Sequence, residues 1–392
     1  MQRLEARGTF PNRQLVQVKI SLWVMLAHRI VPMPSSCDVL PAALATVAIA
    51  CATLGCGAST PGSSPAPPRA SSSVSETARA TAARDPRFDV ELTGTAYPFP
   101  VHFYEFRAQG QTLKMAYMDV RAERPNGHTV LLLHGKNFSA SYWESTIRLL
   151  IARGYRVIAP DQIGFGKSSK PGAYQFSFHA LAESTNALLD AAGVKEVSVI
   201  GHSMGGMLAT RYTLLHGPRV EKLVLVNPIG LEDWKTVVPY KTIDEWYAQE
   251  LKATADTVRE YQKQSYYGGQ WKPEYERLIE VSAGVTQHAD YPKVAWCSAL
   301  TYDMIFTQPV VYEFPLLKVP TLLIIGQRDR TALGRAWAPK DVAATLGDYP
   351  ALGKRVAAAI PGARLVEISG VGHLPQVEAF EAYSKALVGF LP

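Results

Sequence analysis

The sequence predicts an α/β fold, in which a doubly wound, mostly parallel eight-stranded sheet carries an inserted block of helices. Short, continuously apolar segments of strand length alternate along the chain with segments that have helical apolar spacing. Runs that are apolar on both faces are typical of parallel strands covered by helices on each side. Residues 229–318 interrupt this alternation and have helical spacing of their own, which indicates an insertion into the sheet domain.

The first 56 residues are predicted to be an export signal. Val39–Leu54 is apolar and free of charge, and it is too short for a typical membrane span but suits a signal peptide. Thr53–Cys56 resembles a bacterial lipobox, which would place a lipid on Cys56. A start at Met25 would give a signal of ordinary length, and an uncleaved N-terminal membrane anchor is the alternative. The predicted location is therefore exported: periplasmic, envelope-anchored or secreted, in a bacterium.

Residues 57–84 are predicted to be a flexible linker, because Ser, Ala, Pro and Thr dominate and almost no large apolar residue is present to bury. The excess positive charge also lies in the N-terminal part. Residues 1–84 hold eight Lys/Arg and three Asp/Glu, which leaves 32 against 31 for residues 85–392. A nearly neutral body argues against a nucleic-acid partner. We expect a small-molecule substrate. Any membrane tether would be through the N-terminus only, and the sequence makes no prediction about the oligomeric state.

The strands and helices of the sheet domain follow from their apolar patterns. His102–Phe106 and Thr112–Met118 alternate and are predicted to form a β-hairpin. The predicted parallel strands share continuous apolar character and cover residues 129–133, 156–159, 197–200, 222–226, 321–325 and 365–368. The predicted helices between them cover residues 141–152, 178–191, 204–216 and 377–390. Cys297 is the only cysteine in this body, so no disulfide within it is expected.

The insertion at 229–318 divides the predicted sheet domain into residues 85–228 and 319–392. Of its 90 residues, 15 are aromatic. Helical spacing is found in Ile243–Leu251, Thr257–Tyr267 and Tyr275–Val281. We interpret the insertion as a helical cap over the sheet, and the alternative is a set of scaffold helices that do not contact a site.

A nucleophile motif follows one of the predicted strands directly. Gly201-His202-Ser203-Met204-Gly205-Gly206 is a G-x-S-x-G sequence in a strand–turn–helix context. Such a turn is tight, and its glycines remove Cβ atoms that would clash. The Ser203 hydroxyl would then project from the carboxyl edge of the sheet, next to the N-terminus of a helix. The motif predicts Ser203 as a catalytic nucleophile.

A serine nucleophile needs a base that is held in place by a third group. His373 and Asp329 each follow a predicted strand, so a parallel sheet would bring both to the edge where Ser203 lies. We predict His373 as the general base and Asp329 as the acid that orients it. The other strand-end position for the acid is occupied by Asn227, which carries no charge.

The developing oxyanion would need two backbone donors. The Met204 N–H, at the start of a helix, is one predicted donor. The other is expected from the loop His134-Gly135-Lys136-Asn137-Phe138, with the Lys136 N–H preferred and the Asn137 N–H second. Asn137, Phe138 and His202 are predicted to contact substrate, and His134 is interpreted as a residue that shapes the loop.

These motifs together resemble the α/β-hydrolase superfamily over most of residues 98–392. The resemblance depends on HGKNF at 134–138, on Asp161-Gln162-Ile163-Gly164-Phe165-Gly166-Lys167-Ser168, on GHSMGG, on Asp329 and on His373. It implies that the Asp161 loop shapes the wall of the site. The motif order and the position of the insertion resemble the branch with epoxide hydrolases, haloalkane dehalogenases, meta-cleavage-product hydrolases, haloperoxidase-like esterases and prolyl aminopeptidases.

Departures from the relatives in this branch narrow the predicted reaction. Dehalogenases and epoxide hydrolases place Asp at the nucleophile, whereas Ser203 suits acyl transfer. HGKNF differs from the H-G-G-P-G loop of prolyl aminopeptidases and from the Gly-rich loop of meta-cleavage hydrolases. The interval from Asp329 to His373 is longer than usual for the branch, and an extra helix is predicted within Ala336–Ala359.

The predicted function is a serine hydrolase that cleaves a carboxylic ester of a small to medium apolar substrate through an acyl-enzyme on Ser203. The first alternative is a C–C bond or amide hydrolase that uses the same triad. The second is a catalytically silent binding protein on this fold. Neither a metal nor a cofactor is expected, because the sequence has no HExxH motif, no clustered Cys and His, and no dinucleotide-binding fingerprint.

Overall fold

The computed structural model describes residues 84–392. The export signal predicted for residues 1–56 and the linker predicted for 57–84 lie outside this part, apart from Arg84, and they stay predictions. From residue 84 onward, no helix combines the length and apolar character that a membrane span requires. A single 3-10 turn, Pro86–Phe88, precedes the first strand.

The sheet has eight strands in the order β1-β2-β4-β3-β5-β6-β7-β8. Their bounds are β1 Val101–Ala108, β2 Gln111–Val120, β3 Thr129–Leu133, β4 Arg156–Pro160, β5 Val197–His202, β6 Val220–Val226, β7 Thr321–Gly326 and β8 Arg364–Ile368. The β1–β2 hairpin joins the sheet through an antiparallel β2–β4 pair, and all the other pairs are parallel. The predicted fold class is therefore confirmed.

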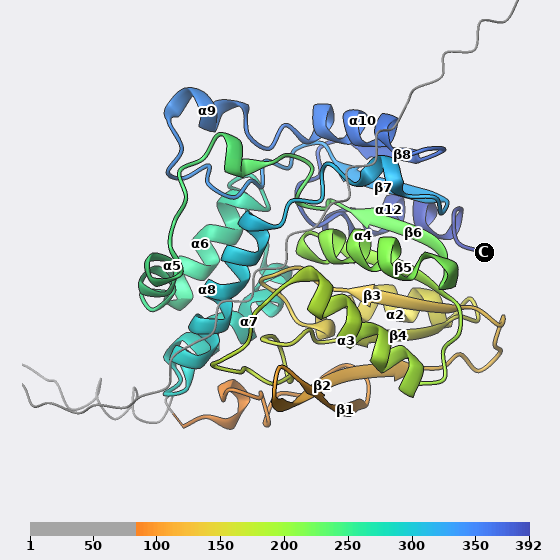
Figure 1. Ribbon diagram of the computed structural model, residues 1–392, viewed down its shortest axis with the longest axis horizontal. Coiled ribbons are helices and arrows are strands. Elements are labelled where there is room, and N and C mark those ends of the chain that lie inside the picture. The colour runs from red at the N-terminus through yellow and green to blue at the C-terminus, as the bar shows by residue number, and fades with distance from the viewer. Residues whose placement is uncertain (1–83) are drawn as a thin grey trace, which may run out of the picture. The chain divides into compact units, whose positions relative to one another are not determined.

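Helices cover both faces of this sheet, as Figure 1 shows. They are α2 Glu144–Ile151, α3 Phe178–Ala191, α4 Met204–His216, α9 Lys340–Thr345, α10 Tyr349–Ala359, α11 Pro375–Glu378 and α12 Phe380–Val388. One face of the sheet packs on α3, α4 and α10, and the other packs on α2 and α12. Strand β3 serves both layers, because Leu131 and Leu133 face the first and Val130 and Leu132 the second.

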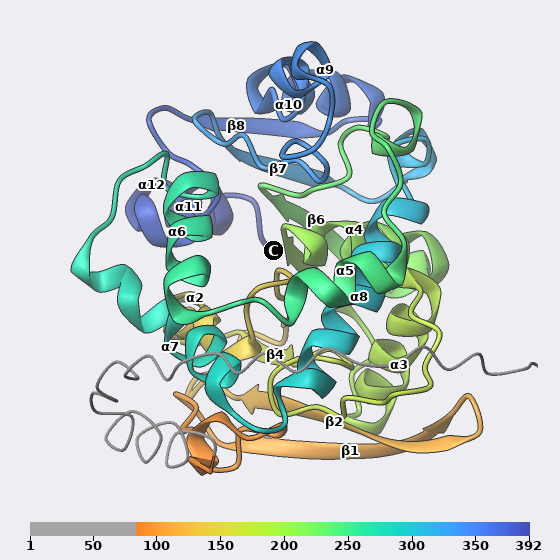
Figure 2. The same cartoon turned by 90° about the vertical axis from the view of Figure 1, so that its left-hand side faces the viewer.

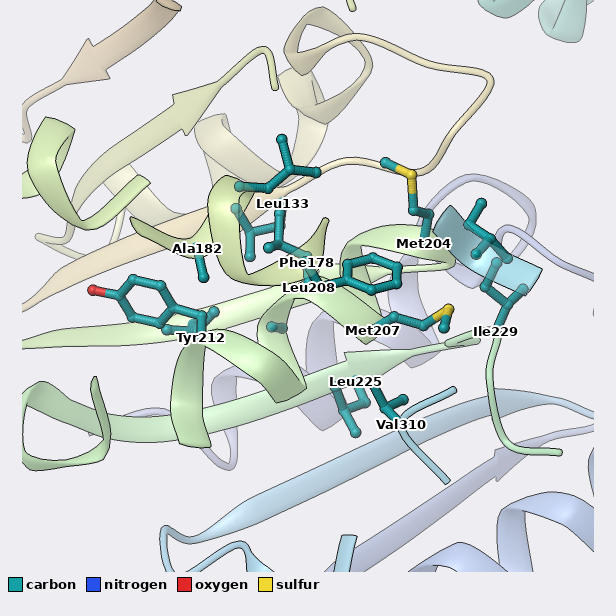
Figure 3. Close-up of a cluster of buried hydrophobic side chains, with 14 of the residues drawn as sticks. Leu133, Phe178, Ala182, Met204, Met207, Leu208, Tyr212, Leu225, Ile229 and Val310 are labelled. Carbon is teal, nitrogen blue, oxygen red and sulfur yellow. The ribbon is translucent and has the colours of Figure 1, made fainter. Parts of the chain in front are cut away.

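Helix α4, which begins directly after the nucleophile turn, lies in the larger of these two clusters. Figure 3 shows its side chains Met204, Met207 and Leu208 among apolar side chains of the sheet and neighbouring segments, including Leu225 of β6. Nine of its 13 residues are buried. Burial of this extent fixes the helix against the sheet and so holds the turn that precedes it.

The insertion contains four helices: α5 Ile243–Glu250, α6 Ala255–Ser265, α7 Glu276–Gly284 and α8 Tyr291–Thr307. In Figures 1 and 2 they lie together at one end of the strands. The first three match predicted segments, but α8 was not predicted. Its apolar residues face more than one side, which weakens the helical period, and Pro292 resembles a break although it lies in the first turn, where proline is tolerated.

Two other segments differ from their predicted boundaries. The single helix predicted for 377–390 is split into α11 and α12 at Ala379, whose backbone is not helical, with φ −140° and ψ 58°. The helix predicted within Ala336–Ala359 is likewise two helices, α9 and α10. Gly347, with a φ of +70°, lies between them, and Pro350 begins the second.

Candidate active site

The turn between β5 and α4 holds Ser203 in a strained backbone conformation, with φ 56° and ψ −122°. Two glycines make this turn sterically feasible. A Cβ on Gly201 would lie 2.1 Å from the carbonyl oxygen of Gly205, and a Cβ on Gly205 would lie 2.1 Å from that of Leu133. Neither position tolerates a side chain, so the strain at Ser203 is imposed by close backbone packing on both sides.

His373 and Asp329 meet in the structure although 44 residues separate them in the chain. His373 Nδ1 donates to Asp329 Oδ2 at 2.6 Å, and both side chains are buried. The carboxylate also accepts from Asn227 Nδ2 at 2.8 Å and from the Thr331 N–H at 2.8 Å. Three donors therefore fix the acid, and the acid fixes the imidazole ring. Asn227, the uncharged residue at the alternative acid position, supports Asp329 in the structure.

The other nitrogen of His373 has no hydrogen-bond partner among residues 84–392. His373 Nε2 is buried and makes no hydrogen bond to any described residue, Ser203 included. The ring nevertheless lies beside the nucleophile turn, because its centroid is 4.8 Å from that of His202. A general base needs this nitrogen free to accept a proton. The hydrogen bond between a base and its nucleophile is often long before substrate binds, so its absence between His373 and Ser203 is compatible with this role.

Backbone donors for an oxyanion flank Ser203. Loop residue Gly135 lies against it, since a Cβ on Gly135 would be 3.1 Å from Ser203 Cβ. Within residues 84–392, no acceptor is found for the N–H of Lys136 or for that of Met204. The Asn137 side chain has another role, because its Nδ2 donates to the Tyr266 hydroxyl at 2.7 Å.

The two other histidines of the site are neutral and connect segments of the backbone. His202 Nε2 donates to the His373 carbonyl at 2.9 Å, and its Nδ1 accepts from the Tyr142 hydroxyl at 3.0 Å. Burial and the neighbouring His373 hold the pKa of His202 well below its usual value. His202 is fully buried and uses both ring nitrogens, so this arrangement does not support the predicted substrate contact.

His134 joins the loops that follow β3 and β4. Its Nδ1 donates to the Gly135 carbonyl at 2.9 Å, and its Nε2 accepts from the Gln162 N–H at 3.0 Å. Burial lowers the pKa of this imidazole, which keeps it neutral and lets it act as donor and acceptor together. The ring thus shapes the two loops, as the sequence suggested.

The loop from Asp161 to Ser168 is organised around the Asp161 carboxylate. Its oxygens accept from the Ala140 N–H at 2.6 Å, the Tyr97 hydroxyl at 2.7 Å and the Lys167 N–H at 2.7 Å. A Cβ on Gly166, whose φ is +49°, would lie 2.1 Å from the same carboxylate. This loop is therefore held rigidly against the segment after β3, and it forms part of a cavity wall.

A cavity of about 820 Å³ lies between these loops and the helical insertion. Lys136, Asn137 and Phe138 line it from the loop after β3, and Gly164 to Gly166 line it from the loop after β4. The insertion contributes residues from all four of its helices, among them Glu250, Tyr261, Val281 and Tyr302. None of Ser203, Asp329 and His373 is among the residues that line it. The cavity is next to the site at the Lys136–Phe138 loop, because the preceding Gly135 lies against Ser203.

Tyr266, just after α6, separates the cavity wall from His373. Its ring stacks on the His373 ring with the centroids 4.5 Å apart, and its hydroxyl accepts from Asn137. Its carbonyl oxygen also accepts from the His373 N–H at 3.0 Å. Sequence reasoning missed Tyr266, because it is one of many aromatics in the insertion and nothing local distinguishes it.

A sequence model described as the alpha/beta hydrolase fold matches residues 128–380. The chain belongs to this family, a family of hydrolases, as its sheet order and the arrangement of Ser203, His373 and Asp329 also indicate. Among solved structures it is similar to a probable hydrolytic enzyme of Pseudomonas aeruginosa PAO1. The identity is 54% and the TM-score 0.77, over 78% of this chain and 98% of that one.

Curated relatives have several activities in their names. The chain is 28% identical to Lipase 1 of Psychrobacter immobilis over 278 residues, which are 68% of this chain and 77% of the lipase. It is 36% identical to a non-heme haloperoxidase of Rhodococcus erythropolis over 105 residues, which are 26% of this chain and 38% of that protein. These names differ in the reaction, so the comparisons show the family and not the reaction of this chain.

Proposed function

We propose that this protein is a serine hydrolase that cleaves carboxylic esters through an acyl-enzyme on Ser203. The observation that carries the proposal is the His373 ring. Asp329 holds it by one nitrogen, while the other nitrogen is unengaged beside a strained serine turn. A serine, a base with a free nitrogen and an orienting carboxylate are the parts that acyl transfer requires.

In the proposed mechanism, His373 Nε2 takes the hydroxyl proton of Ser203 as the serine oxygen attacks the ester carbonyl. The negative charge that develops on the carbonyl oxygen is stabilised by the N–H groups of Met204 and Lys136. Asp329 stabilises the imidazolium, which then gives its proton to the departing alcohol. Water, activated by the same imidazole, attacks the acyl-enzyme and releases the acid.

The substrate would occupy the cavity beside the Lys136–Phe138 loop. A volume of about 820 Å³ suits a medium-sized organic molecule. Apolar side chains such as Phe138, Val258, Leu278 and Val281 line part of it and would contact the acyl or alcohol group. Tyr266 would have to move for an ester bound there to reach Ser203, because it stacks on His373.

The test is hydrolysis of 4-nitrophenyl esters, from acetate to palmitate, by the full chain and by its Ser203→Ala variant. We expect the wild type to hydrolyse these esters, with the highest rate at medium chain length. The variant should show no hydrolysis above the spontaneous rate. The far-UV circular dichroism of the variant should match that of the wild type, since Ala adds no atoms to the turn.

The remaining outcomes separate the alternatives. If no ester is hydrolysed but a fluorophosphonate labels Ser203, the nucleophile is competent and an amide or C–C bond becomes the better substrate. If neither turnover nor labelling is found, the protein is a binding protein on this fold. Full activity in the Ser203→Ala variant would end the proposal.

A further inference from the structure

The Lys136 side chain is a cation without a carboxylate partner in the cavity. No Asp or Glu of the described chain comes within ion-pair distance of its ammonium group. Lys136 Nζ donates to Ser298 Oγ at 2.6 Å and lies 3.4 Å from the centroid of the Tyr302 ring. An ammonium has three N–H donors, so at least one is left for another acceptor in the cavity.

Glu250 offsets this charge only indirectly. Ser298 Oγ donates to Glu250 Oε2 at 2.6 Å, so the serine hydroxyl stands between the carboxylate and the ammonium. Burial away from water lowers the pKa of Lys136 to about 8, although the attraction of the Glu250 carboxylate opposes this shift. The loss of hydration therefore outweighs the attraction of Glu250, and the ammonium is incompletely compensated.

The place of Lys136 in the chain relates this cation to the reacting atoms. Its side chain lines the cavity, while its own N–H is a proposed oxyanion donor and the preceding Gly135 packs on Ser203. An ester whose carbonyl oxygen accepts from the Lys136 N–H could therefore place a second acceptor group at Nζ of the same residue. A carboxylate is the group that best fits an undercompensated ammonium, because it forms a charge-assisted hydrogen bond.

We propose that Lys136 Nζ binds a carboxylate carried by the substrate, so that the preferred esters are half-esters of dicarboxylic acids or similar anionic esters. This proposal rests on the proposed ester hydrolysis and adds a charged group to the apolar substrate that the sequence predicted. Glu250 and Ser298 position the ammonium, and Tyr302 covers it with an aromatic face.

The experiment compares two substrates of matched chain length with the full chain: mono-4-nitrophenyl adipate, which ends in a carboxylate, and 4-nitrophenyl hexanoate, which does not. The quantity measured is the ratio of kcat/KM for adipate to that for hexanoate, after subtraction of spontaneous hydrolysis. In Lys136→Met, which keeps the backbone N–H, the ratio should fall roughly tenfold or more, because a charge-assisted hydrogen bond is lost.

Glu250→Gln should change the adipate-to-hexanoate ratio in the opposite direction. Removal of its negative charge should raise the adipate-to-hexanoate ratio roughly threefold, because the ammonium is then less compensated. If Lys136, Ser298 and Glu250 only joined the insertion to the loop, both variants would lower activity toward both esters and leave the ratio unchanged. A ratio within twofold of the wild type in Lys136→Met, or a lower ratio in Glu250→Gln, would overturn the proposal.

Lys170 provides the matched control. Its side chain also lines the cavity, donates to the Gly166 carbonyl and has its pKa lowered to about 8 by burial. Lys170→Met removes the same charge from a different loop, so it should change the ratio less than about threefold. An equal fall in Lys136→Met and Lys170→Met would mean that the cavity only attracts anions in general, and the assignment to Lys136 would be wrong.

A binding measurement separates this proposal from the proposed function. Calorimetric titration of monomethyl adipate into the Ser203→Ala protein needs no turnover, and adding Lys136→Met should raise the Kd roughly tenfold. If the esters are not hydrolysed but this difference in Kd is found, ester hydrolysis fails and the anion site stands. If neutral esters are hydrolysed through Ser203 and Lys136→Met does not change the Kd, the anion site fails alone.

Discussion

The sheet domain and the helical insertion are built in contrasting ways. Helix α4, which supports the nucleophile, buries nine of its 13 residues, whereas α5 buries only Trp246 and α6 only Gln262. Strands β5 and β7 are buried along their whole length. Helix α5 packs through a stacked pair of rings instead, with Trp246 on Tyr302 of α8 at 4.1 Å between centroids.

This contrast suggests that the sheet edge positions the groups proposed to react, while the insertion surrounds the cavity. The sheet edge holds Ser203, Asp329 and His373, the proposed reacting groups, through backbone packing and buried hydrogen bonds, which leave little freedom to any of them. The insertion presents half-buried aromatic and charged side chains to a cavity, and these can change without disturbing the core. Variants of the buried groups at the sheet edge should therefore abolish chemistry or folding, whereas variants of side chains that line the cavity should change which substrate is preferred.

The largest effect is expected from Asp329→Asn. An amide would present an N–H to His373 Nδ1 and favour the wrong tautomer, so kcat/KM for a 4-nitrophenyl ester should fall about 1,000-fold to 10,000-fold. Initial rates on 4-nitrophenyl butyrate measure this change. Asp341→Asn, an exposed position in α9, is the control and should keep wild-type rates. A fall of less than tenfold in Asp329→Asn would show that another group orients His373.

The next effect is on stability, at Gly205 in the first turn of helix α4. A Cβ at Gly205 would lie 2.1 Å from the Leu133 carbonyl oxygen, so Gly205→Ala should lower the free energy of unfolding by roughly 3 kcal/mol or more. Urea denaturation followed by circular dichroism measures it. In Gly217→Ala, at the residue just after the helix, the new Cβ meets no atom within 4 Å and should change stability by less than about 0.5 kcal/mol. Equal stabilities for the two variants would contradict the close packing at Gly205.

The smallest effect is expected in the insertion, at Tyr266. Tyr266→Ala removes the ring that stacks on His373, so long acyl chains should reach Ser203 more easily. The ratio of kcat/KM for 4-nitrophenyl octanoate to that for the acetate should rise roughly threefold to tenfold. Tyr266→Phe keeps the ring and should leave this ratio near the wild-type value. An unchanged ratio in Tyr266→Ala would mean that substrate reaches Ser203 by a path that avoids this ring.

Much of the sheet domain was predictable because its signals are local. Continuous apolar runs identified the strands, and a glycine-rich turn between a strand and a helix identified Ser203. Asp329 and His373 followed from a rule of parallel sheets, which brings strand ends to one edge, and the structure joins these two residues by a hydrogen bond. The longest helix of the insertion, α8, gave no comparable signal, because its apolar residues face several sides.

The features that would select the substrate depended on contacts between distant segments. HGKNF marked the Lys136 backbone as an oxyanion donor, but nothing in it showed that the side chain points to Ser298, 162 residues away. His202 was expected to contact substrate, and only the packing of Tyr142 and the His373 loop shows that both its ring nitrogens are used.

The sequence by itself therefore determined the sheet, the tight turn at Ser203 and the chain order of the three residues proposed to react. Each of these depends on local backbone geometry or on a general property of parallel strands. The tertiary structure decided the cavity, the stacking of Tyr266 on His373 and the surroundings of the Lys136 ammonium. The physical reason is that desolvation and side-chain pairing arise where separate segments pack together, and no local pattern records which segments those will be.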